Sequence, residues 1–177
     1  MRYAGIIKND VASAPGVCVS FFTQGCPFHC EHCHNPETWD YDGGYEFTDK
    51  TMDELIKALQ ANNVHRNLSI VGGEPLCDNN IPLVFNIIKT LNEKLPSVKI
   101  NIWSGYTWEQ LEQRIKEDQR LCYILHHTSY LIDGRYIHQL RDITLYMRGS
   151  RNQRILDMPK TLANGEPYIV DYGNVFK

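Results

Sequence analysis

Three cysteines and three histidines are concentrated in one short stretch, GCPFHCEHCHN, residues 25–35. Cys26, Cys30 and Cys33 have the spacing C-x3-C-x2-C, which brings three thiolates into a single loop. Thiolates spaced in this way are typical ligands of a metal ion or an iron–sulfur cluster. A disulfide explains the pattern less well, because no pairing uses all three cysteines.

Two metal centres compete for this loop. Structural zinc takes four ligands, and His29, His32 or His34 could supply the fourth. Zinc sites commonly join two distant ligand pairs, however, and Cys77 and Cys122 each stand alone in the sequence. A four-iron cluster normally takes four cysteines, so three would leave one iron open to a substrate or cofactor. The spacing favours such a cluster, and a zinc-stabilised binding module without catalysis is the alternative.

The composition is that of an ordinary soluble protein. The chain has 177 residues, 42% hydrophobic and 22% charged, which predicts one domain over residues 1–177. The net charge of −3, with no basic patch, argues against nucleic acid as a partner. We expect a cytoplasmic protein without membrane contact, because the sequence has no secretion signal and no apolar run that could span a bilayer.

Strand-like and helix-like segments alternate along the chain. Thr51 and Glu54 are expected to form a capping box at the start of the helix over 48–62. Thr107 is the expected N-cap of the helix over 108–118. Residues 121–127 give no clear signal for a helix or a strand. The sequence predicts strands over 17–22, 67–71, 98–103, 129–134, 142–147 and 167–173, and helices over 48–62, 80–95 and 108–118.

This alternation predicts an α/β fold with a mostly parallel sheet. A partial (open) βα barrel fits best, because a closed eight-unit barrel usually needs about 250 residues. The cysteine loop, the glycine turn at 72–75, Ser104–Gly105 and Asp133–Gly134 each follow a predicted strand. Ligands bind at the carboxyl ends of parallel strands, so these four segments should converge on one mouth.

Two motifs give the chain a specific resemblance. C-x3-C-x2-C with an aromatic-type residue before the last cysteine, here His32, resembles the signature of radical S-adenosylmethionine enzymes. The Gly-Gly-Glu-Pro turn of residues 72–75 resembles the second mark of that superfamily. Residues 34–39, 104–109 and 131–134 are similar to glycyl-radical activating enzymes, and RGSRNQR, residues 148–154, to the activators of anaerobic ribonucleoside-triphosphate reductase.

The similarity runs from about Gly16 to Arg154, and the tail after about residue 154 is unmatched. His34 stands where many reductase activators have tyrosine, and "CHN" is closer to pyruvate formate-lyase activators. An activator of pyruvate formate-lyase or of another glycyl-radical enzyme is therefore the alternative within the superfamily. We expect Cys18, Cys77 and Cys122 to be structural thiols.

The resemblance implies one [4Fe–4S] cluster on Cys26, Cys30 and Cys33, with S-adenosylmethionine chelating the fourth iron. It implies that one electron, from a donor such as flavodoxin, cleaves this cofactor to a 5′-deoxyadenosyl radical. That radical would abstract hydrogen from a glycine of the reductase. The implied cofactor-binding residues, besides Cys33, are His32, His34, Gly72, Gly73, Glu74 and Ser104. Asp133 and residues 148–154 would contact the adenosine or shape the partner surface.

Overall fold

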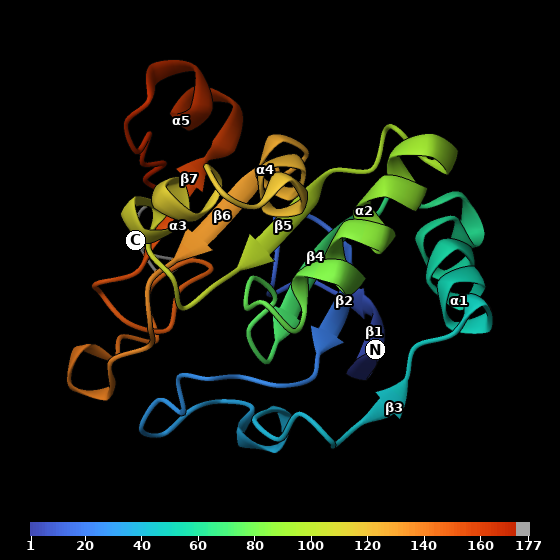
Figure 1. Cartoon of the computed structure of the whole chain (residues 1–177), viewed down its shortest axis with the longest axis horizontal. Helices are drawn as coiled ribbons and strands as arrows, with labels where there is room; N and C mark the ends of the chain where they lie inside the picture. The colour runs from blue at the N-terminus through green and yellow to red at the C-terminus, as the bar shows by residue number, and fades with distance from the viewer. Residues whose placement is uncertain (173–177) are drawn as a thin grey trace.

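A seven-stranded sheet organises residues 1–172, which are the residues that the computed structural model describes. Its strand order is β3-β1-β2-β4-β5-β6-β7 (Figure 1). The strands are β1 Arg2–Asp10, β2 Cys18–Thr23, β3 Tyr45–Glu46, β4 Asn67–Gly72, β5 Ile100–Trp103, β6 Tyr130–Asp133 and β7 Arg154–Asp157. The α-helices are α1 Asp49–Leu59, α2 Ile81–Lys94, α3 Trp108–Arg114, α4 Gln119–His126 and α5 Met158–Asn164.

The middle of the sheet is parallel and its margins are antiparallel. β2, β4, β5 and β6 pair in parallel, whereas β1 pairs antiparallel with β2 and β3, and β7 antiparallel with β6. The sheet therefore ends at β3 and β7 instead of closing on itself. This confirms the prediction of an α/β fold with an open, partial barrel.

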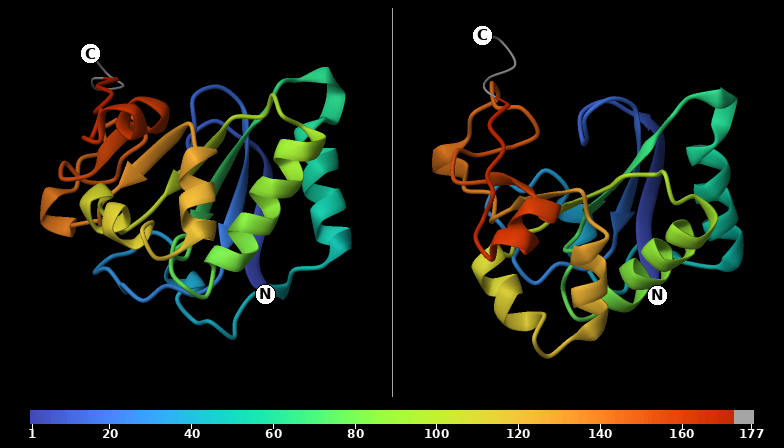
Figure 2. Two further views of the ribbon diagram at one scale, coloured as in Figure 1. Left: turned by 45° about the horizontal axis from the view of Figure 1, so that its top comes forward. Right: turned by 90° about the horizontal axis from the view of Figure 1, so that it is seen from above.

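Helices cover one face of the sheet, and the connection between β1 and β2 lies over part of the other face (Figure 2). Leu68 and Ile70 of β4 are fully buried in the core that the sheet forms with α1, α2 and α4. On the opposite face, the carbonyl of Ser13 accepts hydrogen bonds from Ser69 Oγ at 2.9 Å and from Trp103 Nε1 at 3.1 Å. The connection between β1 and β2 is thereby held across the strands that lead to the site.

Several local predictions were wrong. Thr48, not Thr51, caps α1, and Thr51 supplies the other half of the box in place of Glu54. Residues 142–147 form turns instead of a strand, because no ladder of consecutive pairs forms: Leu145 is an isolated bridge residue, and the bridge between Arg141 and Ser150 flanks the segment.

The tail differs from its prediction as well. Only Ile169 of the proposed last strand pairs, through one bridge to Leu156, and residue 173 lies outside the described residues. Five elements were not predicted from the sequence: β1, β3, β7, α4 and α5. Within residues 1–172, no helix is both long and apolar enough to cross a membrane.

Candidate functional site

An open pocket of about 720 Å³ lies at the carboxyl ends of the parallel strands. The segments that follow β2, β4, β5 and β6 all contribute to its wall, as the topology predicted. The lining includes all the predicted cluster ligands and cofactor-binding residues, whereas Asp133 is not part of it. These residues are Cys26, Cys30, His32, Cys33, His34, Gly72, Gly73, Glu74 and Ser104.

The cysteine loop is closed at its base by backbone hydrogen bonds. Gly25 N donates to Thr38 O at 2.8 Å, and Cys26 N donates to Trp39 O at 3.1 Å. The two acceptors are the last residue and the C-cap of a short 3-10 helix, Pro36–Thr38. The loop thus leaves and rejoins the sheet edge at fixed points, which confines all three cysteines to the pocket.

Within the loop the backbone turns at two histidines. His29 and His32 have φ values of 45° and 53°, in the left-handed region that non-glycine residues seldom occupy. The ring of His29 stacks on Trp39 at 4.8 Å, and the ring of His32 lies 4.1 Å from that of His138. These ring contacts help to hold a conformation that is strained in isolation.

The three thiols are suited to a soft metal centre. All six cysteines of the chain are free, and they all lie within the described residues. Burial raises the pKa of the Cys26 thiol to about 11, and burial also raises the pKa of the Cys30 thiol. Both thiols are therefore neutral at pH 7 until a metal displaces the proton. Across residues 1–172, no three His, Cys, Asp or Glu side chains are grouped to hold a single metal ion.

The glycine turn after β4 packs directly against the base of the cysteine loop. Gly72 has a φ of +97°, and a Cβ there would lie 2.8 Å from backbone atoms of Phe22 and Thr23. A Cβ on Gly73 would lie 2.3 Å from the carbonyl oxygen of Gly25. Glu74 N donates to that same oxygen at 2.9 Å. Both glycines are thus required by the close approach of two backbone segments, independently of any ligand.

Glu74 is buried, and its carboxylate joins two of the strand ends. Its Oε1 accepts hydrogen bonds from Ser104 Oγ at 2.8 Å and from Leu76 N at 2.9 Å. Its Oε2 accepts from Gly105 N at 2.6 Å. The carboxylate therefore ties the glycine turn to the end of β5, and Ser104 is oriented by Glu74 at the pocket wall.

The charge state of Glu74 predicts a pH dependence of stability in the cluster-free protein. Burial raises its pKa to about 7 from 4.5, although three hydrogen bonds and Arg114 oppose the shift. Glu74 therefore holds its proton more tightly in the folded state than in the unfolded state. The contribution of this proton to the free energy of unfolding is fully present below about pH 4.5 and is lost as the pH rises to about 7. Glu74→Gln should remove this dependence. Urea unfolding at several pH values tests it, and a pH-independent difference between wild type and variant would contradict it.

The two histidines of the prediction lie at the exposed side of the pocket. The His32 side chain is 61% exposed and lies 3.6 Å from Glu31. His34 is exposed too. His126 is exposed at the end of α4, and His127, the C-cap of that helix, stacks on Tyr123; neither residue lines the pocket.

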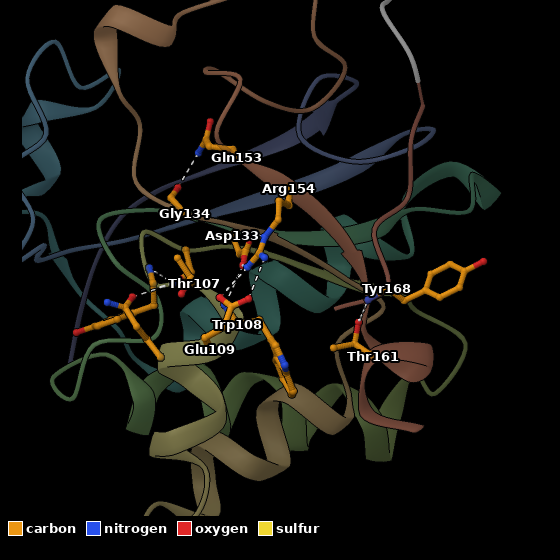
Figure 3. A network of polar contacts seen from close by, with 12 residues as sticks. Thr107, Trp108, Glu109, Asp133, Gly134, Gln153, Arg154, Thr161 and Tyr168 are labelled. Atoms are coloured by element: carbon orange, nitrogen blue, oxygen red, sulfur yellow. Dashed lines mark hydrogen bonds and ion pairs between the residues drawn. The ribbon is translucent and has the colours of Figure 1, made fainter. Parts of the chain in front are cut away.

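Asp133, at the end of β6, is held by a polar network (Figure 3). Its carboxylate is buried and accepts hydrogen bonds from Arg154 Nε at 2.9 Å and from Trp108 N at 2.8 Å. Arg154 also donates to both oxygens of Glu109, at 2.9 Å each. Asp133 thus anchors β6, β7 and the start of α3 to one another, and its oxygens are engaged by the protein itself.

Arg154→Gln should destabilise the protein by about 3–5 kcal/mol, because it leaves the Asp133 carboxylate buried without its cation. Glu109→Gln is the matched control. The Glu109 side chain is 57% exposed, so its loss should cost at most about 1 kcal/mol. Chemical denaturation of both variants measures the difference, and equal costs would show that Asp133 does not depend on Arg154.

Sequence reasoning missed several residues of the pocket wall. They come from β1 and the loop after it, from the cysteine loop itself, from the end of β5 and from the turn after β6. Apolar β1 residues carried no recognisable period, and an isolated Phe or Arg in a loop gives no signal by spacing. The principal ones are Ile7, Asp10, Ala12, Ser13, Phe28, Trp39, Trp103 and Arg135.

Comparison with known proteins defines the class first. A family model described as a 4Fe-4S single cluster domain matches residues 12–156, which is most of the chain, and this is therefore an iron–sulfur protein. Its relatives include an anaerobic ribonucleoside-triphosphate reductase-activating protein of Salmonella typhi, 30% identical over 86% of this chain and 96% of the relative. The chain belongs to the family of these activating proteins.

Further relatives with the same name come from a bacterium and from a virus. The protein of Vibrio cholerae serotype O1 is 31% identical over 88% of this chain and 97% of its own length. The protein of Enterobacteria phage T4 is 32% identical over 88% of this chain and 93% of its own length. The similarity therefore extends over nearly the whole of each relative.

Proposed function

We propose that this chain is a radical S-adenosylmethionine activase, formed by a single domain, that generates the glycyl radical of anaerobic ribonucleoside-triphosphate reductase. The observation that carries the proposal is the pocket in which the three cysteines meet the Gly-Gly-Glu turn. The names of the relatives supply the reaction and the partner.

Cys26, Cys30 and Cys33 would hold one [4Fe–4S] cluster and leave its fourth iron to the methionine group of S-adenosylmethionine. When bound, this cluster supplies the electron that cleaves the cofactor to methionine and a 5′-deoxyadenosyl radical, which takes hydrogen from a glycine of the reductase. The donor set fits, because three free thiols and no fourth cysteine line the pocket.

The other residues would bind and orient the cofactor. Gly72 and Gly73 bring the backbone of the turn to the pocket wall, where carbonyl groups could accept from the methionine amine. Glu74 fixes the turn and Ser104 by its hydrogen bonds, so it acts mainly on the shape of this subsite. His32 and His34 would lie at the exposed side, toward solvent.

We also propose a flavodoxin-like electron donor and a cytoplasmic location, with no nucleic acid or membrane as partner. The net charge of −3 supports the exclusion of nucleic acid. The pocket is open, which suits a partner that inserts a loop of its own chain.

Metal analysis of anaerobically purified protein tests the cluster. After reconstitution with iron and sulfide, we expect about four irons and four sulfides per chain and a brown colour that bleaches in air. A colourless, air-insensitive protein with stoichiometric zinc would overturn the proposal and support the binding module.

A further inference from the structure

The turn after β6 is held in place by the segment that resembles reductase activators, residues 148–154. Gln153 Nε2 donates to Gly134 O at 3.0 Å, as Figure 3 shows, and Asn152 Nδ2 donates to Arg135 O at 2.8 Å. Gly134 N donates in turn to Tyr106 O at 3.1 Å. The backbone at Arg135 is therefore held from two sides. Asn152 and Gln153 of the segment 148–154 thus have a structural role in holding this turn.

From this turn the side chain of Arg135 reaches the cysteine loop. Its guanidinium carbon lies 4.1 Å from the centre of the Phe28 ring, a cation–π contact. Phe28 stands between Cys26 and Cys30 in the sequence and is itself held, because its ring packs edge-on against Tyr106 at 4.8 Å. The positive charge of Arg135 is thus positioned over the loop that carries the thiols.

The residues after Arg135 continue along the same loop. His138 lies against His32, and Gln139 Nε2 donates to Glu31 Oε2 at 3.4 Å. Arg135 and Tyr136 line the same pocket as Cys30, so this turn and the cysteine loop face one space.

The charge of Arg135 is not neutralised by an ion pair. None of the ion pairs within residues 1–172 includes it, whereas Arg114 and Arg154 are paired with carboxylates. The reduction potential of an iron–sulfur cluster depends on the net charge around it and on hydrogen bonds to its sulfurs. A fixed cation beside one ligand stabilises the reduced state, which carries one more electron.

We propose that Arg135 is a positioning residue that raises the reduction potential of the cluster by holding an unpaired positive charge over Phe28, between the first two cysteines of the cysteine loop. The inference rests on the cluster of the proposed function. The reduction potential distinguishes this role from a purely structural one. A residue that only shapes the pocket would leave the reduction potential of the cluster unchanged.

Arg135→Gln should lower the equilibrium constant for one-electron reduction about tenfold, which is about 59 mV for a one-electron couple. Arg135→Lys, which keeps the charge, should stay close to wild type. The measurement is a redox titration of the reconstituted protein with dithionite, followed by the electron paramagnetic resonance of the reduced cluster without S-adenosylmethionine. An unchanged potential in Arg135→Gln would overturn the inference.

Arg148→Gln is the matched control, because Arg148 lines the same pocket and its charge acts on Asp142. If the reduction potential falls as far in Arg148→Gln as in Arg135→Gln, the effect is a general one of charge in the pocket, and the specific role of Arg135 is overturned. If Arg135→Gln holds too little iron to titrate, recovery of iron and potential in Arg135→Lys supports the inference, and no recovery overturns it. A wild-type protein without any cluster would instead refute the proposed function.

Discussion

Cys30→Ser is expected to abolish the cleavage of S-adenosylmethionine, with a loss of at least about a thousandfold. Serine is a poor ligand for iron, and with only two thiols left in the loop the cluster should not persist. Release of 5′-deoxyadenosine under anaerobic reducing conditions measures the activity. Iron content and visible absorption measure the cluster itself and should fall together with the activity.

Cys122→Ser is the control for this experiment. Cys122 lies on α4, partly exposed, outside the pocket wall, and it is a free thiol like Cys30. The variant should keep the iron and the activity of the wild type. Retention of the cluster in Cys30→Ser, or its loss in Cys122→Ser, would refute the assignment of the ligands.

Gly73→Ala should disrupt both the fold near the pocket and the cluster. The new Cβ would meet the carbonyl oxygen of Gly25 at 2.3 Å, and that oxygen belongs to backbone that cannot swing aside like a side chain. Overpacking of this kind costs about 1–3 kcal/mol or more. Because Gly25 precedes Cys26, the shift also displaces the first cysteine of the loop, so iron content should fall.

Gly5→Ala is the matched substitution elsewhere in the sheet. Gly5 lies in β1, and a Cβ there would meet no atom within 4 Å. Urea unfolding and iron analysis of the two variants should separate them clearly. A Gly73→Ala protein with wild-type stability and iron would show that the close approach of the two backbones is dispensable.

The parallel centre of the fold was predictable because its signals are local. Leu68 and Ile70 in β4, and the apolar face of α2, follow directly from hydrophobic spacing. The meeting of the cysteine loop with the glycine turn also followed, since both come after parallel strands. The margins were not predictable, because β1 and β7 depend on antiparallel partners that are set by tertiary packing.

Within the site, too, some residue roles were predictable from local sequence and others depend on tertiary packing. The spacing of the cysteines predicted a metal-binding loop, but nothing in the sequence indicated that Glu74 is buried against Ser104 and Gly105. The segment 148–154 was expected to contact the cofactor or the partner. Within the segment, Arg154 holds Asp133, and Asn152 and Gln153 hold the turn that carries Arg135. Contact of the segment with the cofactor or the partner stays a prediction.

The most direct test of the central claim is the radical itself. The reconstituted protein is reduced without air, mixed with S-adenosylmethionine and the anaerobic ribonucleoside-triphosphate reductase, and examined by electron paramagnetic resonance. The account predicts a glycyl radical on the reductase together with 5′-deoxyadenosine in solution. 5′-Deoxyadenosine without the radical would point to a different glycyl-radical partner, and the absence of both from a cluster-loaded protein would contradict the account.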